Sequence, residues 1–153
     1  MSRGRRRVGV VLLLDPPVAD EVQGLRRALG DTSLAAIGPH LTLVPPLNIA
    51  ESRVGEVIGT LRMAAGAQPG PISLVLGPVL TFLPISPVLY LGIGASDETE
   101  LGALDRLRST VLDGPLGRPQ RWPWAPHVTV CDEVPDGAVD ESAAVAFGGY
   151  AVE

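Results

Sequence analysis

One short pattern occurs twice in this chain and constrains its fold more than any other feature. The pattern is proline, histidine, an aliphatic residue, threonine and a second aliphatic residue, at residues 39–43 (PHLTL) and 126–130 (PHVTV). The chain has only two histidines, so each of them lies inside one copy. A single short motif is weak, but coincidence is a poor explanation when both histidines have the same neighbours. The sequence therefore predicts two related halves.

The same order of elements leads into each copy of the motif. Before the first copy, the apolar residues predict a strand at 8–14 and then a helix that ends at Gly30. A strand at 88–95 and a helix that begins after Asp97 precede the second copy in the same way. The chain thus repeats one unit of strand, helix, loop and strand.

Further elements are predicted outside the repeated unit. Asn48 and Glu51 match a capping box, which predicts that a second helix begins there. An interrupted strand is expected at 72–84, and a short helix is expected near 139–146. These elements would connect the two halves and follow the second one.

Strand geometry indicates what the repeated motif presents. Successive side chains point to opposite faces of a strand, and residues i and i+2 lie about 6.6 Å apart. His40 and Thr42 therefore share one face, while the aliphatic residues beside them point into a core. His127 and Thr129 are related in the same way. If the two halves face each other, two imidazoles and two hydroxyls line one cleft.

This set of side chains suits in-line displacement at phosphorus. Imidazoles titrate near neutrality, so one can act as a general base and the other as a general acid. The hydroxyls can donate to the non-bridging oxygens of a phosphate. Two histidines and one cysteine, Cys131, do not make a convincing metal site. We therefore predict catalysis by side chains alone, with no metal and no cofactor.

The paired motifs PHLTL and PHVTV resemble the two HxTx signatures of the 2H phosphoesterase superfamily, and most closely those of its LigT-like, or 2′-5′ RNA ligase, family. The resemblance covers nearly the whole chain. It implies a bilobal α+β fold with two antiparallel-sheet lobes, helices outside, pseudo-two-fold symmetry and an active-site cleft between the lobes. We expect a single domain over residues 1–153, and we expect the final strand typical of the family to be missing.

The resemblance also implies an activity. Members of this family hydrolyse 2′,3′-cyclic phosphates on RNA ends or nucleotides without a metal and leave a 2′-phosphate, and some join RNA ends in 2′-5′ linkage. His40, Thr42, His127 and Thr129 match the motif and are the predicted catalytic residues. By family analogy His40 is the proton donor and His127 the proton acceptor, an assignment that the residues alone leave open.

Three other functions are compatible with the same residues. The first is a cyclic phosphodiesterase for small nucleotides, such as ADP-ribose 1″,2″-cyclic phosphate. The second is an RNA- or nucleotide-binding module without turnover. The third is a structural α+β domain, in which both histidines would be buried in the core.

The loop before the second motif, GRPQRWPWAP at 117–126, holds candidate substrate-binding residues. Arg118 and Arg121 can bring positive charge to a phosphate, and Trp124 can stack on a base, a contact worth about 1–3 kcal/mol. Solvated loop charges and core packing are the alternatives for these three. Cys131 shares a strand face with His127 but lies about 13 Å from it, so we predict a packed core thiol rather than a nucleophile.

Charge and hydropathy bound the class of protein. The formal net charge is −5, which excludes broad nucleic-acid coating and favours small substrates over long RNA. All 12 basic residues are arginine, and four of them lie in a basic arm at 1–7 that we expect to be flexible. No apolar run approaches the ~20 residues that span a bilayer, and a lone cysteine fits a reducing compartment. We expect a cytoplasmic monomer that contacts no membrane and binds RNA ends or a small cyclic nucleotide.

Overall fold

A computed structural model describes residues 4–120 and 123–133 of the chain. The elements in chain order are β1 (Arg5–Leu13), α1 (Val18–Ala28), β2 (His40–Ala50), a 3₁₀ turn (Glu51–Arg53), α2 (Val54–Ala67), β3 (Val75–Thr81), β4 (Leu89–Gly94), α3 (Glu98–Leu112) and β5 (His127–Cys131). The helix predicted near 139–146 lies outside the described residues.

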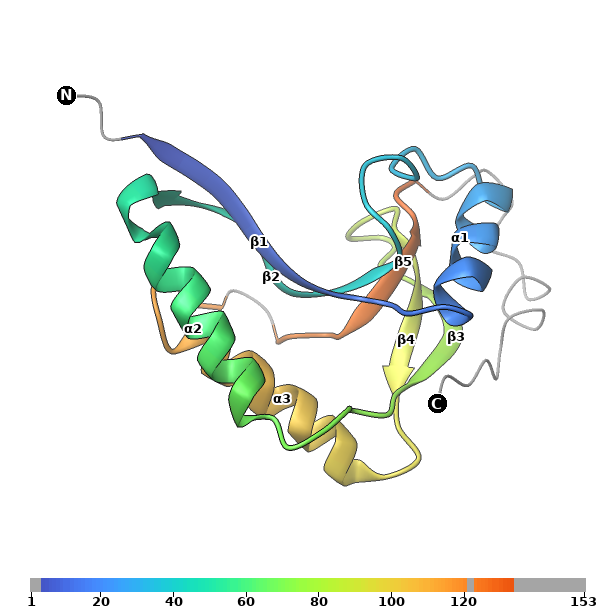
Figure 1. Ribbon diagram of the computed structural model, residues 1–153. Helices are drawn as coiled ribbons and strands as arrows, with labels where there is room; N and C mark the ends of the chain where they lie inside the picture. The colour runs from blue at the N-terminus through green and yellow to red at the C-terminus, as the bar shows by residue number, and fades with distance from the viewer. Residues whose placement is uncertain (1–3, 121–122, 134–153) are drawn as a thin grey trace.

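The strands form two antiparallel sheets. β1 pairs with β2 in one sheet, and β3, β4 and β5 lie in that order in the other. In Figure 1, α2 and α3 run together along the first sheet, whereas α1 lies beside the second sheet. The fold is therefore α+β with two antiparallel sheets, consistent with the bilobal fold that the paired motifs predict.

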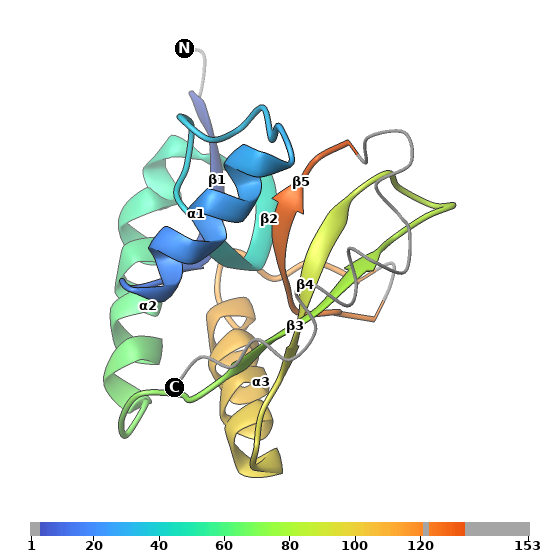
Figure 2. The same cartoon turned by 90° about the vertical axis from the view of Figure 1, so that its right-hand side faces the viewer.

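Each helix of the repeated unit packs on a strand of the other half. The helix α1, which precedes β2, contacts β5, and α3, which precedes β5, contacts β2. The strands β2 and β5 also contact each other, and Figures 1 and 2 show them side by side. Because each helix packs on a strand of the other half, the two halves share one core. Leu41, Leu104 and Val128 lie in this core and are each at most 1% exposed.

The strand β2 continues through two prolines that the sequence pattern places at its end. Pro45 and Pro46 have no N–H to donate to the sheet, and the pairing of β1 with β2 shifts register next to them. The shift falls at Gly9 on β1, where an added Cβ would lie 3.2 Å from the carbonyl oxygen of Val44. A bulge thus absorbs the prolines, and β2 is longer than its apolar run predicts.

Two predictions at this end of the sheet are wrong. The basic segment expected to be flexible contributes Arg5–Arg7 to β1, and Arg6 donates to the carboxylate of Glu51 at 2.8 Å. The predicted capping box does not form, because Asn48 belongs to β2 and α2 begins only at Val54, with no side-chain cap. Both errors have one cause: β1 and β2 pair over a longer stretch than their apolar residues indicate.

The second half follows its sequence pattern more closely. The helix α3 begins as predicted, with the Asp97 side chain accepting a hydrogen bond from the Thr99 backbone N–H at 2.9 Å. This hydrogen bond lowers the pKa of Asp97. The predicted interruption of β3 is a register shift at Gly77, whose φ of 120° lies in the region that favours glycine. None of the helices in the described ranges combines the length and apolar character needed to cross a membrane.

Candidate active site

The two motifs occupy equivalent positions on β2 and β5. In each strand the histidine and the threonine are half-buried, and the aliphatic residue after each of them is buried. Leu41 and Leu43 are 1% and 2% exposed, and Val128 and Val130 are fully buried. The alternation predicted from the sequence is therefore present in both strands, with an apolar face in the core and a polar face that solvent reaches.

Each imidazole is held by the backbone carbonyl two residues before it. Nδ1 of His40 lies 2.9 Å from the Gly38 oxygen, and Nδ1 of His127 lies 2.8 Å from the Ala125 oxygen. A carbonyl oxygen can only accept, so Nδ1 carries the hydrogen in both rings. The hydrogen bond thereby leaves Nε2 as the nitrogen that can take up or release a proton. Within residues 4–120 and 123–133, neither Nε2 has a hydrogen-bond partner of its own.

The proline of each motif explains why this contact forms twice. Pro39 separates the Gly38 carbonyl from His40, and Pro126 has the same place in the second copy. Proline fixes its own φ near −65° and restricts the residue before it to extended backbone. The proline therefore favours a backbone in which the carbonyl can reach the imidazole, and the remaining torsions depend on the surrounding structure.

Two aromatic rings flank His127. Phe82 and Tyr90 stack with their ring centres 4.1 Å apart. Both present an edge contact to the imidazole, with centre-to-centre distances of 5.0 Å for Phe82 and 5.3 Å for Tyr90. Such packing restricts rotation of the ring. In the described part of the chain no aromatic ring packs on His40 in this way, so the two histidines have different surroundings.

The sequence did not predict that this aromatic pair contacts His127. Phe82 follows β3, and Tyr90 lies on β4 directly across from Thr129, so both reach His127 only because β3, β4 and β5 are neighbours in one sheet. Aromatic residues make up 4% of the chain. Their scarcity is a weak signal that becomes informative only once the strand order is known.

The loop that leads into His40 is secured by a buried ion pair. Arg26 on α1 is 2% exposed, and its Nε donates to Asp31 at 2.8 Å. Its Nη1 donates at 2.9 Å to the carbonyl of Ile37, the residue before Gly38. Burial alone would raise the pKa of Asp31, but hydrogen bonds from Arg26 and the neighbouring serine, together with the Arg26 charge, lower it. This network fixes the backbone that holds the first imidazole.

The predicted substrate-binding residues lie in different surroundings. Arg118 is exposed and donates to two carbonyls of its own loop at 3.2 and 2.7 Å. Trp124 is half-buried against the core, and the guanidinium carbon of Arg108 lies 4.6 Å from its ring centre. Arg121 lies outside the described residues. Substrate binding by these three residues stays a prediction.

Cys131 is a core residue, as predicted. Its side chain is 3% exposed, and Sγ donates to the Glu133 carbonyl at 2.9 Å. Burial of this kind leaves no access for a nucleophilic role. Nowhere in the described ranges do three or more histidine, cysteine, aspartate or glutamate side chains gather as they would around a metal ion.

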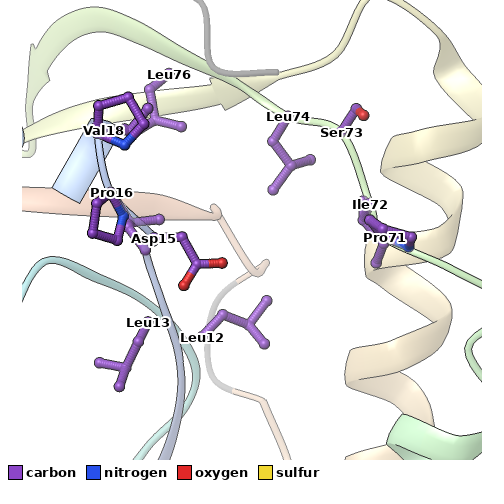
Figure 3. Close-up of a pocket in the computed structure, with 12 residues that line it drawn as sticks. Leu12, Leu13, Asp15, Pro16, Val18, Pro71, Ile72, Ser73, Leu74 and Leu76 are labelled. Carbon is purple, nitrogen blue, oxygen red and sulfur yellow. The ribbon is translucent and has the colours of Figure 1, made fainter.

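A separate cavity of about 390 Å³ lies at the junction of β1, α1 and the segment before β3. Figure 3 shows its lining, in which Asp15 is the one ionisable side chain among mainly apolar neighbours such as Leu12 and Leu74. Neither motif contributes to this lining. A carboxylate repels a phosphate anion, so the cavity does not supply the chemistry that the motifs indicate.

Comparison with known proteins adds an independent finding. Residues 14–148, which include both motifs, match a family model described as the 2′-5′ RNA ligase superfamily. A protein of Bacillus pumilus named "Putative phosphoesterase" is 30% identical over 128 residues, covering 84% of this chain and 71% of the relative. Proteins with the same kind of name from Bacillus cytotoxicus and a Geobacillus species are 26% and 27% identical over 130 and 128 residues. These matches cover 85% and 84% of this chain, and 72% and 70% of the relatives.

Proposed function

The chain belongs to the 2′-5′ RNA ligase superfamily of 2H phosphoesterases, and from that premise we propose that it opens 2′,3′-cyclic phosphates of RNA ends or nucleotides to 2′-phosphates. Membership implies phosphoesterase activity. The finer activity rests on the two motifs, and its chemistry needs only side chains and water.

The single observation that carries the proposal is the matched anchoring of the two imidazoles. Both rings donate Nδ1–H to a carbonyl at 2.8–2.9 Å, which leaves one titratable nitrogen on each ring. In-line displacement at phosphorus uses a base on the attacking side and an acid on the leaving side, and two imidazoles on neighbouring strands can supply both. Both imidazoles also lie on the half-buried face of their strands, whereas purely structural histidines would be expected in the core.

The reaction balances with these groups. Nε2 of His127 takes a proton from water, whose oxygen forms a bond to phosphorus, and Nε2 of His40 gives a proton to the departing 3′ oxygen as its bond to phosphorus breaks. The hydroxyls of Thr42 and Thr129 donate to the non-bridging oxygens as negative charge grows there. The assignment of acid and base follows the family analogy. If a 5′-hydroxyl replaces water, the same steps join two RNA ends in 2′-5′ linkage.

A small cyclic nucleotide is the second candidate substrate, and one observation favours it. The net charge of −5 is unfavourable for binding a long phosphate backbone. Among the described residues, three arginines are also paired with carboxylates: Arg6, Arg26 and Arg53. Recognition would then depend on the cyclic phosphate and its nearest groups, as in ADP-ribose 1″,2″-cyclic phosphate, rather than on an extended strand.

A substrate panel with product analysis tests the proposal. The protein would be incubated with cyclic mononucleotides, a short RNA that ends in a 2′,3′-cyclic phosphate, ADP-ribose 1″,2″-cyclic phosphate, and paired RNA halves. ³¹P NMR would identify the product of each reaction. We expect 2′-phosphate products from the 2′,3′-cyclic substrates, and we expect His40→Ala and His127→Ala to form them roughly 10²–10⁴-fold more slowly. A 3′-phosphate product would contradict the mechanism. Binding of these compounds without turnover by the wild type would show a binding module instead.

A further inference from the structure

Arg108, near the end of α3, contacts three separate segments of the chain. Its Nε donates to the carbonyl of Leu43 at 3.1 Å, and its Nη2 donates to the side chain of Gln120 at 3.0 Å. The guanidinium carbon also lies 4.6 Å from the ring centre of Trp124, within the range of a cation–π contact. One half-buried side chain therefore joins a strand, a loop and an aromatic ring.

Two of these contacts, those with Leu43 and Trp124, lie next to a part of the candidate site. Leu43 follows Thr42 in β2, the strand of the first motif. Trp124 directly precedes Ala125, whose carbonyl holds the imidazole of His127. The anchor on β2 is the carbonyl of Leu43, which is 2% exposed and lies at a register shift between Thr42 and Val44, both of which pair with β1. It serves as the reference point on the strand of the first motif. Arg108 thus connects that reference point to the segment that orients the second imidazole.

Arginine is suited to this task. Its planar guanidinium presents donors in a rigid fork and stacks on aromatic faces. Lysine could keep the positive charge over Trp124, but a single ammonium cannot reproduce the fork that spans the Leu43 carbonyl and Gln120. The geometry therefore uses the shape of the side chain as well as its charge.

We propose that Arg108 is a positioning residue for His127: anchored on the Leu43 carbonyl, it holds Trp124 and, through Trp124, the adjoining Ala125 carbonyl that orients the imidazole. The expected effect of Arg108 on the reaction rate rests on the proposed function. The positioning itself is a structural claim that can be measured without turnover.

The first measurement uses the small number of histidines. Because the chain has only two, long-range ¹H–¹⁵N spectra of the imidazoles contain two sets of signals, which His40→Ala and His127→Ala assign. In the wild type we expect the Nδ1–H form for His127, and we expect Arg108→Met to shift its ring signals toward a mixture of tautomers. Arg106→Met is the matched control, since Arg106 is an exposed arginine on the same helix. Unchanged His127 signals in folded Arg108→Met would overturn the proposal.

The second measurement is kinetic and separates positioning from a general loss of structure. With rates expressed per folded molecule, Arg108→Met should lower kcat by about 10²-fold, the effect of a small misplacement, and leave KM within a few-fold. Arg108→Lys should fall between Arg108→Met and the wild type, and it also serves if Arg108→Met does not fold. In a His127→Ala background, Arg108→Met should cause no further loss, because the residue it positions is gone.

The outcomes of the two measurements can be told apart. An undiminished effect of Arg108→Met in the His127→Ala background would show a structural role and overturn the proposal. So would a kcat equal to that of Arg106→Met. If the wild type turns over none of the substrates, the proposed function fails, and the imidazole spectra still decide whether Arg108 positions His127.

Discussion

Replacement of Arg26 by methionine should destabilise the protein far more than the same change at its neighbour. Arg26 is 2% exposed and Asp31 is 5% exposed, and they form an ion pair of 2.8 Å. Methionine keeps much of the apolar stem but leaves the Asp31 carboxylate buried without its cation, which costs about 3–5 kcal/mol in comparable pairs. Arg27 is exposed on the same helix, so Arg27→Met is the matched control.

The loss is large against the total stability of a domain, which is typically about 5–15 kcal/mol. It corresponds to a fall in Tm of about 6–20 °C for a chain of this size. Urea unfolding followed by circular dichroism would give the free energy of unfolding of the wild type and of both variants. A value for Arg26→Met within about 0.5 kcal/mol of that for Arg27→Met would refute the account of the buried network.

The same network predicts a pH dependence. Because folding lowers the pKa of Asp31, the folded protein binds that proton less tightly than the unfolded chain does. The stabilisation from this group is therefore complete above the ordinary aspartate pKa of about 3.9 and is lost as pH falls through the lowered value. Arg26→Met should show a smaller decline of unfolding free energy over that acidic range. An equal decline in both proteins would show that Asp31 does not contribute to it.

Two further predictions concern the reaction. Saturating chelator should leave hydrolysis of a cyclic phosphate unchanged, because the acid, the base and the phosphate donors are all side chains; a loss of activity that a divalent ion restores would show a different mechanism. Thr42→Ala and Thr129→Ala should each lower kcat less than loss of a histidine does, because each removes one neutral donor and leaves the acid–base pair intact. Steady-state rates for the single mutants test this, and a threonine mutant as inactive as a histidine mutant would contradict it.

The features that the sequence predicted well depend on local rules. Alternation along a strand places His40 beside Thr42, and the proline of each motif brings a carbonyl to the imidazole. The start of α3 was predictable for the same reason, because Asp97 caps its own neighbours. In these cases the atoms that determine the structure lie within a few residues of each other in the chain.

The features that could not be predicted from the sequence depend on contacts between distant segments. Tyr90 reaches His127 through the pairing of β4 with β5, and Arg108 reaches Leu43 because α3 packs on the strand of the other half. The extent of β2 also depends on its partner, since Gly9 on β1 accommodates the proline bulge. Periodicity along one segment carries no information on which other segment will lie against it.

The proposed acid–base pair can be tested directly by the pH–rate profile for opening of a 2′,3′-cyclic phosphate. One imidazole must be neutral and the other charged, so the wild-type rate should rise and then fall with pH, with limbs that belong to the coupled pair. His40→Ala and His127→Ala should each lower the rate by roughly 10²–10⁴-fold, and the double mutant should be little worse than either. A flat profile between about pH 5 and 9, with near-normal rates in both single mutants, would show that the two motifs are structural.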